Sequence, residues 1–162
     1  MQLMTIGSKA NAISQFVGFG VENEEYCIEI LKVQEIIRMV EITRVPNAAY
    51  YLEGIINLRG KVIPVVDFRK RFNLAESAQG NEASRRIIVV ALERMTVGIV
   101  VDRVTQVVKL EEEQISPAPS AAASADGDAI RGVAKVGEKL VILLDPELLL
   151  GAECYAGIAA AA

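Results

Sequence analysis

The sequence predicts a mainly β protein built from two small five-stranded barrels that share an apolar interface. The composition favours sheet: 52% of the residues are hydrophobic, but only 5% are aromatic and none is Trp. The core must therefore be formed by Val, Ile, Leu and Ala, and β-branched residues suit strands. Short runs of alternating apolar and polar residues end at polar turns, which is the pattern of β-hairpins. The two halves of the chain also resemble each other, which indicates two lobes of one topology.

The first predicted element is a hairpin over residues 16–30. Tyr26 and Ile28 fall on one face of its second strand, whereas Cys27 falls on the other. This alternation predicts a half-buried hairpin with one face toward the core. The apolar pattern then continues over residues 33–37, which we expect to form a third strand or a bent extension of the hairpin.

A second hairpin, over residues 54–67, is the most informative stretch. Two apolar runs flank Arg59 and Gly60, and the second run ends at Asp67, a residue suited to cap a short helix. Gly60 is expected because it adopts a positive φ without strain. Asn57 and Arg59 are more polar than a turn requires. Arg59 is therefore either a solvated turn residue or a residue that binds a partner.

Two further hairpins are predicted in the second half of the chain. One pairs residues 87–92 with 97–101, and the other pairs residues 130–136 with 140–144. The residue after the last hairpin, Asp145, is expected to cap a short helix, because a proline follows it at the first helical position.

An internal repeat supports the two-lobe prediction. Residues 16–37 align without gaps to residues 87–108, and residues 54–67 align to residues 132–145, with Gly, Lys and Asp shared in the second pair. Each lobe would have about five short strands, and closing them into a barrel removes exposed sheet edges.

The two copies differ at the hairpin of residues 54–67. The second copy lacks Asn57 and Arg59, which indicates that the fold does not require them. Pro64 stands where the second copy has Ile142. Because proline cannot donate to a strand ladder, Pro64 predicts that this hairpin lies at a sheet edge and is open to a partner.

The predicted domain covers residues 14–151. Lobe 1 spans about residues 14–80 and lobe 2 about residues 85–151, and the sequence leaves open whether strands cross between the lobes. Residues 1–13 and 152–162 carry no packing pattern, so we expect a flexible arm and a flexible tail.

Composition excludes several classes of function. The net charge is −4 and no long basic run is present, which argues against nucleic-acid binding. The apolar runs are far shorter than the roughly 20 residues that span a bilayer. Two cysteines are too few for a disulfide framework, so we expect a soluble protein of the reducing cytoplasm.

The absence of histidine removes Ser-His-Asp and Cys-His nucleophilic sites and all histidine-containing metal sites. One alternative is a small β-barrel enzyme or ligand-binding protein that uses Asp67, Asp102 and Asp145. The lack of a Gly-rich phosphate loop and of metal-ligand spacing counts against it. No cofactor, metal or catalytic residue is predicted.

The ordered motifs of the chain resemble those of the CheW family of bacterial chemotaxis coupling proteins over about residues 15–151. The segments that carry the resemblance are residues 26–37, 42–47, 54–67, 98–104 and 142–145. The resemblance implies two SH3-like β-barrel lobes and a non-enzymatic adaptor. Such an adaptor bridges the cytoplasmic tips of methyl-accepting chemoreceptors to the regulatory domain of the histidine kinase CheA. It would be cytoplasmic and would associate with receptor arrays through these partners, either for motility or in another chemosensory pathway.

The resemblance also implies site residues. Receptor-binding roles are implied for Val33, Glu35, Ile36, Gly54, Asn57, Arg59, Val100 and Val104. Kinase-binding roles are implied for Ile42, Thr43, Arg44, Val45 and Pro46.

Simpler interpretations accompany several of these residues. Glu35 is either solvent-facing or an internal ion-pair partner of Arg59. Val33 and Ile36 are core residues unless their strand lies at the seam between the lobes. The charged run of residues 69–71 is expected to be a solvated helix face without a site role.

Overall fold

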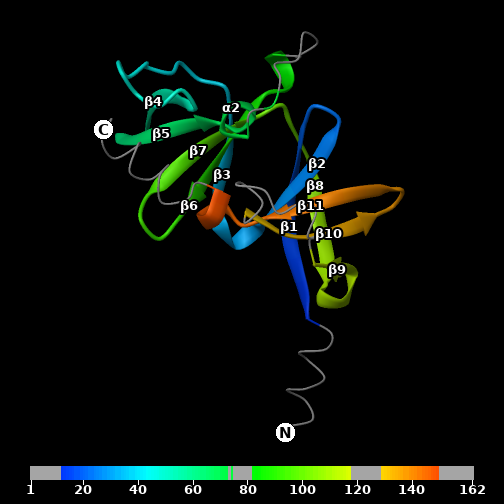
Figure 1. Cartoon of the computed structure of the whole chain (residues 1–162). Helices are drawn as coiled ribbons and strands as arrows, with labels where there is room; N and C mark the ends of the chain where they lie inside the picture. Colours follow the sequence, from blue (N-terminus) through cyan, green and yellow to red (C-terminus); the bar gives the residue numbers. More distant parts are fainter. Residues whose placement is uncertain (1–11, 73, 75–81, 118–128, 150–162) are drawn as a thin grey trace, which may run out of the picture.

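The computed structural model describes residues 12–72, 74, 82–117 and 129–149, which form a mainly β fold of two sheets (Figure 1). The predicted tail of residues 152–162 and most of the predicted arm lie outside these residues. The strands are β1 (Ile13–Val21), β2 (Glu24–Glu29), β3 (Val33–Arg38), β4 (Leu52–Leu58), β5 (Lys61–Asp67), β6 (Arg86–Ala91), β7 (Thr96–Val101), β8 (Arg103–Glu111), β9 (Ile115–Ser116), β10 (Ile130–Val136) and β11 (Lys139–Leu144). The short helices are η1 (Ile30–Lys32), α2 (Phe68–Arg71), η2 (Glu82–Ser84) and η3 (Glu112–Gln114), and residues 146–149 are also helical.

The two halves of the chain exchange their first hairpins. One sheet has the strand order β8-β1-β2-β11-β10-β9, and the other has the order β3-β6-β7-β5-β4. The internal repeat maps β1 and β2 onto β6 and β7, so each sheet takes its first hairpin from the opposite half of the sequence. The exchanged hairpins join through parallel pairs, β2 with β11 and β7 with β5. Strand crossing, which the sequence left open, is therefore present, and neither sheet is formed by one continuous half of the chain.

The predicted strand count is correct for one sheet only. The other sheet has six strands, because the two-residue strand β9 pairs with β10. Its counterpart in the five-stranded sheet is an isolated bridge, in which Thr43 and Ile55 exchange backbone hydrogen bonds of 2.9 and 2.8 Å. The bridge and β9 therefore pair with equivalent edge strands, β4 and β10, and only β9 is long enough to count as a strand.

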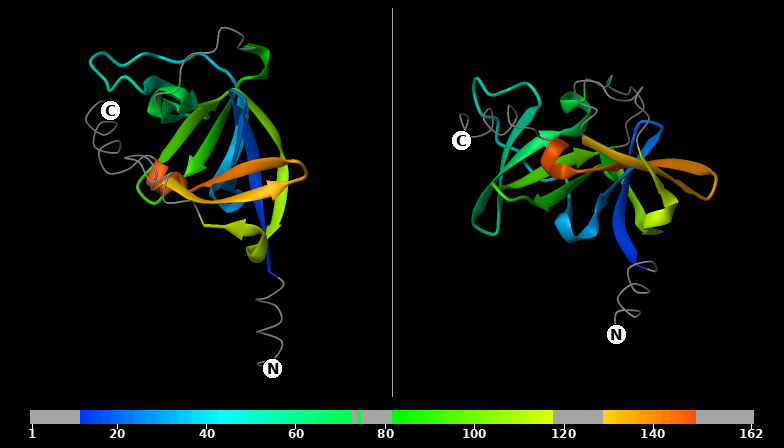
Figure 2. Two further views of the ribbon diagram at one scale, coloured as in Figure 1. Left: turned by 45° about the vertical axis from the view of Figure 1, so that its right-hand side comes forward. Right: turned by 60° about the horizontal axis from the view of Figure 1, so that its bottom comes forward.

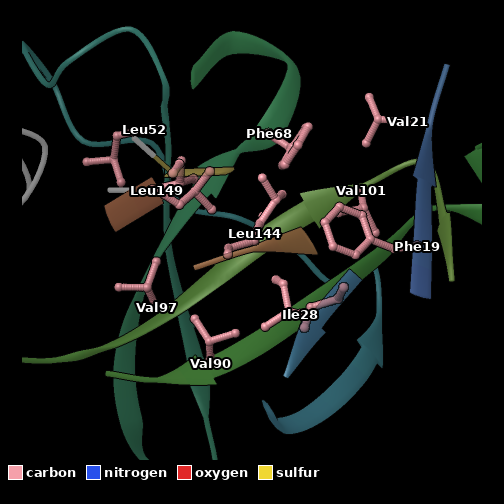
Figure 3. Packing of buried hydrophobic residues seen from close by; sticks show 14 residues of the cluster. Phe19, Val21, Ile28, Leu52, Phe68, Val90, Val97, Val101, Leu144 and Leu149 are labelled. Carbon is pink, nitrogen blue, oxygen red and sulfur yellow. The ribbon is translucent and has the colours of Figure 1, made fainter. Parts of the chain in front are cut away.

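Three apolar clusters form the interior of the part of the chain that the structure describes. The six-strand core lies inside the six-stranded sheet and includes Phe16 and Cys27. The five-strand core lies inside the five-stranded sheet and includes Ile63 and Ile87. The inter-sheet core lies between the two sheets (Figure 3), with Phe19 and other side chains of both sheets. Because each of the first two clusters draws side chains from every strand of its sheet, each sheet curls around its own core.

The exchanged hairpins are buried on both faces. In β6, Ile87 faces the five-strand core and Ile88 faces the inter-sheet core, and both side chains are 0% exposed. In β2, Cys27 and Ile28 divide in the same way between the six-strand core and the inter-sheet core. The prediction of a half-buried first hairpin is therefore wrong, because an exchanged strand contributes to a barrel core and to the seam between the sheets.

Candidate functional site

The turn between β4 and β5 is tightly specified. Arg59 and Gly60 both adopt a positive φ, 53° and 85°, as the two central residues of a type I′ hairpin turn do. The Asn57 side-chain oxygen accepts a hydrogen bond of 2.8 Å from the Gly60 amide. Asn57 therefore stabilises this turn, although the equivalent β10–β11 hairpin forms with Lys135 at this position.

Arg59 forms an ion pair with Glu35 of β3. The Arg59 side chain is nevertheless 69% exposed, so its guanidinium is oriented by Glu35 and remains open to solvent. This contact confirms the internal ion pair that the sequence left as one alternative for Glu35. An exposed pair of this kind contributes little to stability, about 0–1 kcal/mol.

Pro64 leaves the end of this hairpin without a neighbour on one side. β5 pairs with β7 only from Val65 onward. In the other sheet, the equivalent parallel pairing of β11 with β2 already includes Val141 and Ile142. β4 is also the last strand of its sheet, which confirms the predicted edge. Val62, in the part of β5 that pairs with β4 but not with β7, is 60% exposed. The hairpin projects away from the β10–β11 hairpin, which points toward the opposite end of the molecule (Figure 2).

The remaining predicted receptor residues of the strands lie in three different environments. Val33 and Val104 occupy equivalent positions in the repeat, and both pack against the inter-sheet core, so they lie at the seam. Ile36 is 39% exposed on β3. Val100 is only 3% exposed inside the five-strand core. The prediction that Val100 contacts a partner is therefore wrong, because its side chain faces the interior of the barrel.

Gly54 connects the hairpin to the predicted kinase segment. Its φ is +150°, and a Cβ at this position would lie 2.1 Å from the carbonyl oxygen of Thr43. Only glycine allows residues 42–43 to approach β4 this closely. Gly54 is buried, so any influence on a partner acts through the shape of this segment.

The predicted kinase segment forms an ordered rim. Ile42 packs against the five-strand core, whereas Thr43, Arg44 and Pro46 are exposed. Arg44 and Val45 face an open recess on the side of α2. The other residues that line this recess are Asn47, Ala48, Ala49, Tyr50, Leu52, Glu53 and Lys70.

The comparisons with known proteins agree with this geometry. A family model of the CheW-like domain matches residues 15–154. The chain belongs to the CheW family. The chemotaxis protein CheW of Klebsiella aerogenes is 40% identical over 139 residues, which cover 86% of this chain and 82% of the relative. The chemotaxis protein CheW of Bacillus subtilis is 34% identical and matches 86% of this chain and 88% of its own. The crystal structure of the scaffolding protein TtCheW from Thermoanaerobacter tengcongensis superposes with a TM-score of 0.78 at 34% identity, and the match covers 87% of this chain and 90% of that chain.

CheW proteins are non-catalytic scaffolds, and two aspartates of this chain, Asp67 and Asp145, have structural roles at the starts of helices. Asp67 accepts hydrogen bonds from the amides of Arg69 and Lys70 at the start of α2, and Asp145 accepts one from the amide of Glu147. Within residues 12–72, 74, 82–117 and 129–149, no group of three or more His, Cys, Asp and Glu side chains could hold a metal ion. The helices of this described part include none long and apolar enough to cross a membrane.

The CheW fold of this chain contains one polar cluster that sequence reasoning missed. Arg69 pairs with Asp102 and Glu22, and its side chain is only 13% exposed. Arg103 donates a hydrogen bond of 2.9 Å to the Glu22 carbonyl. The expectation that residues 69–71 form a solvated face is therefore wrong for Arg69. Its partners lie 33 and 47 positions away in sequence, so no local pattern could have revealed them.

This Arg69 cluster lies where the chain passes from one sheet to the other. Asp102 connects β7 of the five-stranded sheet to β8 of the six-stranded sheet, and Glu22 forms the β1–β2 turn. Desolvation opposes ionisation of Asp102, but hydrogen bonds from Arg69 and the Glu22 amide outweigh it and lower the pKa of Asp102. The cluster therefore holds Asp102 charged and ties α2 to the exchanged hairpin.

Proposed function

We propose that this chain couples methyl-accepting chemoreceptors to the histidine kinase CheA, as a scaffold without catalytic activity of its own. Membership of the CheW family supports a role among chemotaxis proteins. The specific partners are part of the proposal. The hairpin surface around Arg59 contacts the receptor, and the rim of residues 42–46 contacts the regulatory domain of the kinase.

The observation that carries the proposal is the exposure of an oriented Arg59 at an unpaired sheet edge. The guanidinium is a rigid fork of donors that suits a carboxylate or carbonyl of a partner. Val62 on β5 and Ile36 on β3 add exposed apolar area. In the other copy of the repeat the turn is formed by Gly137 and Glu138. A two-residue hairpin turn at this place therefore forms without an arginine, and binding to a partner would account for Arg59.

The proposed mechanism is positional. The scaffold forms no covalent bond, and it holds the kinase in a fixed geometry relative to the receptor. A ligand-induced change in the receptor then alters the relative stability of the kinase states, which is the requirement for coupling between two sites. Because Gly54 allows the rim of residues 42–46 to pack directly on β4, both proposed surfaces belong to one rigid element. The same mechanism would serve a chemosensory pathway that does not control motility.

The test compares two charge reversals on equivalent hairpins. Arg59→Glu should reduce receptor-dependent activation of CheA at least about tenfold, because a central interface arginine commonly contributes more than about 1.4 kcal/mol to binding. Lys135→Glu makes the same charge change on the exposed part of the β10–β11 hairpin and should leave activation nearly unchanged. Far-UV circular dichroism and the melting temperature should be close to those of the parent chain for both variants. Normal activation by a folded Arg59→Glu variant would refute the assigned role.

A further inference from the structure

The molecule has two short helices at equivalent places, and their local structures match closely. Asp67 precedes α2 and accepts a hydrogen bond of 2.8 Å from the Arg69 amide. Asp145 precedes the helix of residues 146–149 and accepts one of 2.9 Å from the Glu147 amide. The amides of both aspartates donate in turn to equivalent carbonyls, at 2.9 and 2.8 Å. The two helices therefore begin with equivalent backbone hydrogen bonds.

Each of the two helices covers part of the inter-sheet core, and α2 has extensive buried contacts. Phe68 is 1% exposed, and its ring contacts those of Phe19, Tyr26 and Phe72 at centroid distances of 5.4, 4.8 and 4.8 Å. Arg69 adds the largely buried ion pairs with Asp102 and Glu22. A buried guanidinium with charged partners is costly to separate, so α2 is fixed to both sheets.

The second helix has a different set of anchors. Leu149 is 2% exposed and belongs to the inter-sheet core (Figure 3). Glu147, at the position of Arg69, accepts a hydrogen bond of 2.9 Å from the Glu93 amide. It also lies 3.7 Å from the ammonium group of Lys32, with the two side chains 24% and 37% exposed. Leu148 in the same helix is 51% exposed.

The crossover beside the second helix explains the difference. Leu31 of η1 lies between β2 and β3, at the position that Asp102 has between β7 and β8, and it is 85% exposed. An acidic helix residue and a leucine cannot form the buried pair that Arg69 and Asp102 form. The helix of residues 146–149 therefore depends on the partly exposed contacts of Glu147, which water and salt weaken, and on the buried apolar side chains of Pro146 and Leu149. A helix of four residues has almost no stability of its own.

We propose that the helix of residues 146–149 is a lid on the inter-sheet core. It lifts in a local opening that leaves α2 and both sheets in place. Glu147 is the residue that holds the lid closed, through Glu93 of the β6–β7 turn and Lys32 of the crossover. Lifting removes Leu149 from the inter-sheet core and makes the apolar surface beneath it accessible. This device does not depend on the proposed coupling function.

Hydrogen exchange of the full chain tests the lid, because α2 provides an internal control. The Leu149 amide donates to Asp145 and the Phe72 amide donates to Phe68, so each reports the opening of its own helix. We expect Leu149 to exchange at least about tenfold faster than Phe72, through an opening that responds little to denaturant, as local rather than global unfolding does. Equal protection of the two amides, lost only in global unfolding, would overturn the proposal.

Two variants then test the role of Glu147. Glu147→Ala should speed exchange at Leu149 by about fivefold, the effect of losing a charge-assisted hydrogen bond and a weak ion pair, and should leave exchange at Phe72 unchanged. Lys32→Gln, which removes only the ion pair, should give a smaller change of the same kind. The lid is refuted if Glu147→Ala accelerates both amides equally, or if it accelerates neither.

Discussion

At the scale of the residue, two glycines of one hairpin show how similar residues carry different constraints. Gly60 needs a positive φ but has nothing within 4 Å of a would-be Cβ. Gly54 has both an unusual φ and the Thr43 carbonyl oxygen at 2.1 Å from that position. Gly60 is therefore constrained by the turn alone, whereas Gly54 is constrained by its own positive φ, at a register shift in β4, and by the segment packed on it.

Alanine substitutions separate the two constraints. Gly60→Ala should lower the free energy of unfolding by about 1–2 kcal/mol, the cost of a left-handed conformation. Gly54→Ala should lower it by about 2–4 kcal/mol, because overpacking against Thr43 adds to the backbone strain. Urea denaturation of both variants provides the comparison. Equal losses would show that the segment of residues 42–46 is not seated tightly on β4.

Single residues also mark the limit of sequence reasoning. The turn at Arg59 and Gly60 and the cap at Asp67 were predictable, because hairpin and cap signals are local. The contact of Arg59 with Glu35 could be named only as one of two alternatives, since it depends on how far the sheet curls. Val100 was misplaced because one continuous apolar strand does not show which of its faces points into the barrel.

At the scale of the element, the rim of residues 42–46 and the β4–β5 hairpin are the two proposed partner surfaces. They meet at the bridge between Thr43 and Ile55 but present different side chains. The rim offers Val45 and Arg44 beside the recess, whereas the hairpin offers Val62 and Arg59. Substitutions on one should therefore affect one partner more than the other.

The same change on each surface tests this division. Val45→Asp should weaken pull-down of the CheA regulatory domain at least about tenfold more than pull-down of a receptor tip, because a new charge at an interface centre must be desolvated. Val62→Asp, at a 60% exposed position, should show the opposite preference. Equal loss of both partners in either variant would indicate general misfolding rather than a separate surface.

At the scale of the whole molecule, strand exchange is the feature that the alternation of apolar and polar residues did not reveal. The repeat predicted two lobes of one topology, and the structure has two sheets of related strand order. Period-two alternation identifies a strand and its two faces, but it does not identify its neighbour in the sheet. One indication of the exchange was present in residues 87–90, a continuous apolar run, because a strand buried on both faces loses its alternation.

The Arg69 cluster, which ties α2 to the exchanged hairpin, should make part of the stability depend on acid. The folded-state pKa of Asp102 is lowered, so its contribution is present above the unfolded-state pKa of about 3.9 and is lost as pH falls through the folded-state value. Arg69→Ala should cost about 2–3 kcal/mol at pH 7 and less than that at about pH 2. The raised pKa of Asp67, caused first by desolvation, acts in the opposite direction, but the parent chain and the Arg69→Ala variant share this contribution. Melting temperatures of the parent chain and of the Arg69→Ala variant, measured from pH 7 to about pH 2, show how the loss of stability depends on pH. An equal loss at every pH would contradict this role of Asp102.

The central claim is that Arg59 serves a partner and not only its own fold. The most direct measurement is receptor-dependent CheA activity with the double variant Glu35→Arg, Arg59→Glu, which can restore the internal ion pair while it reverses the charge offered at the surface. We predict that the double variant is as stable as the parent chain and as inactive in coupling as Arg59→Glu alone. Recovery of normal coupling by the double variant would contradict the claim, because it would show that the internal ion pair is all that Arg59 provides.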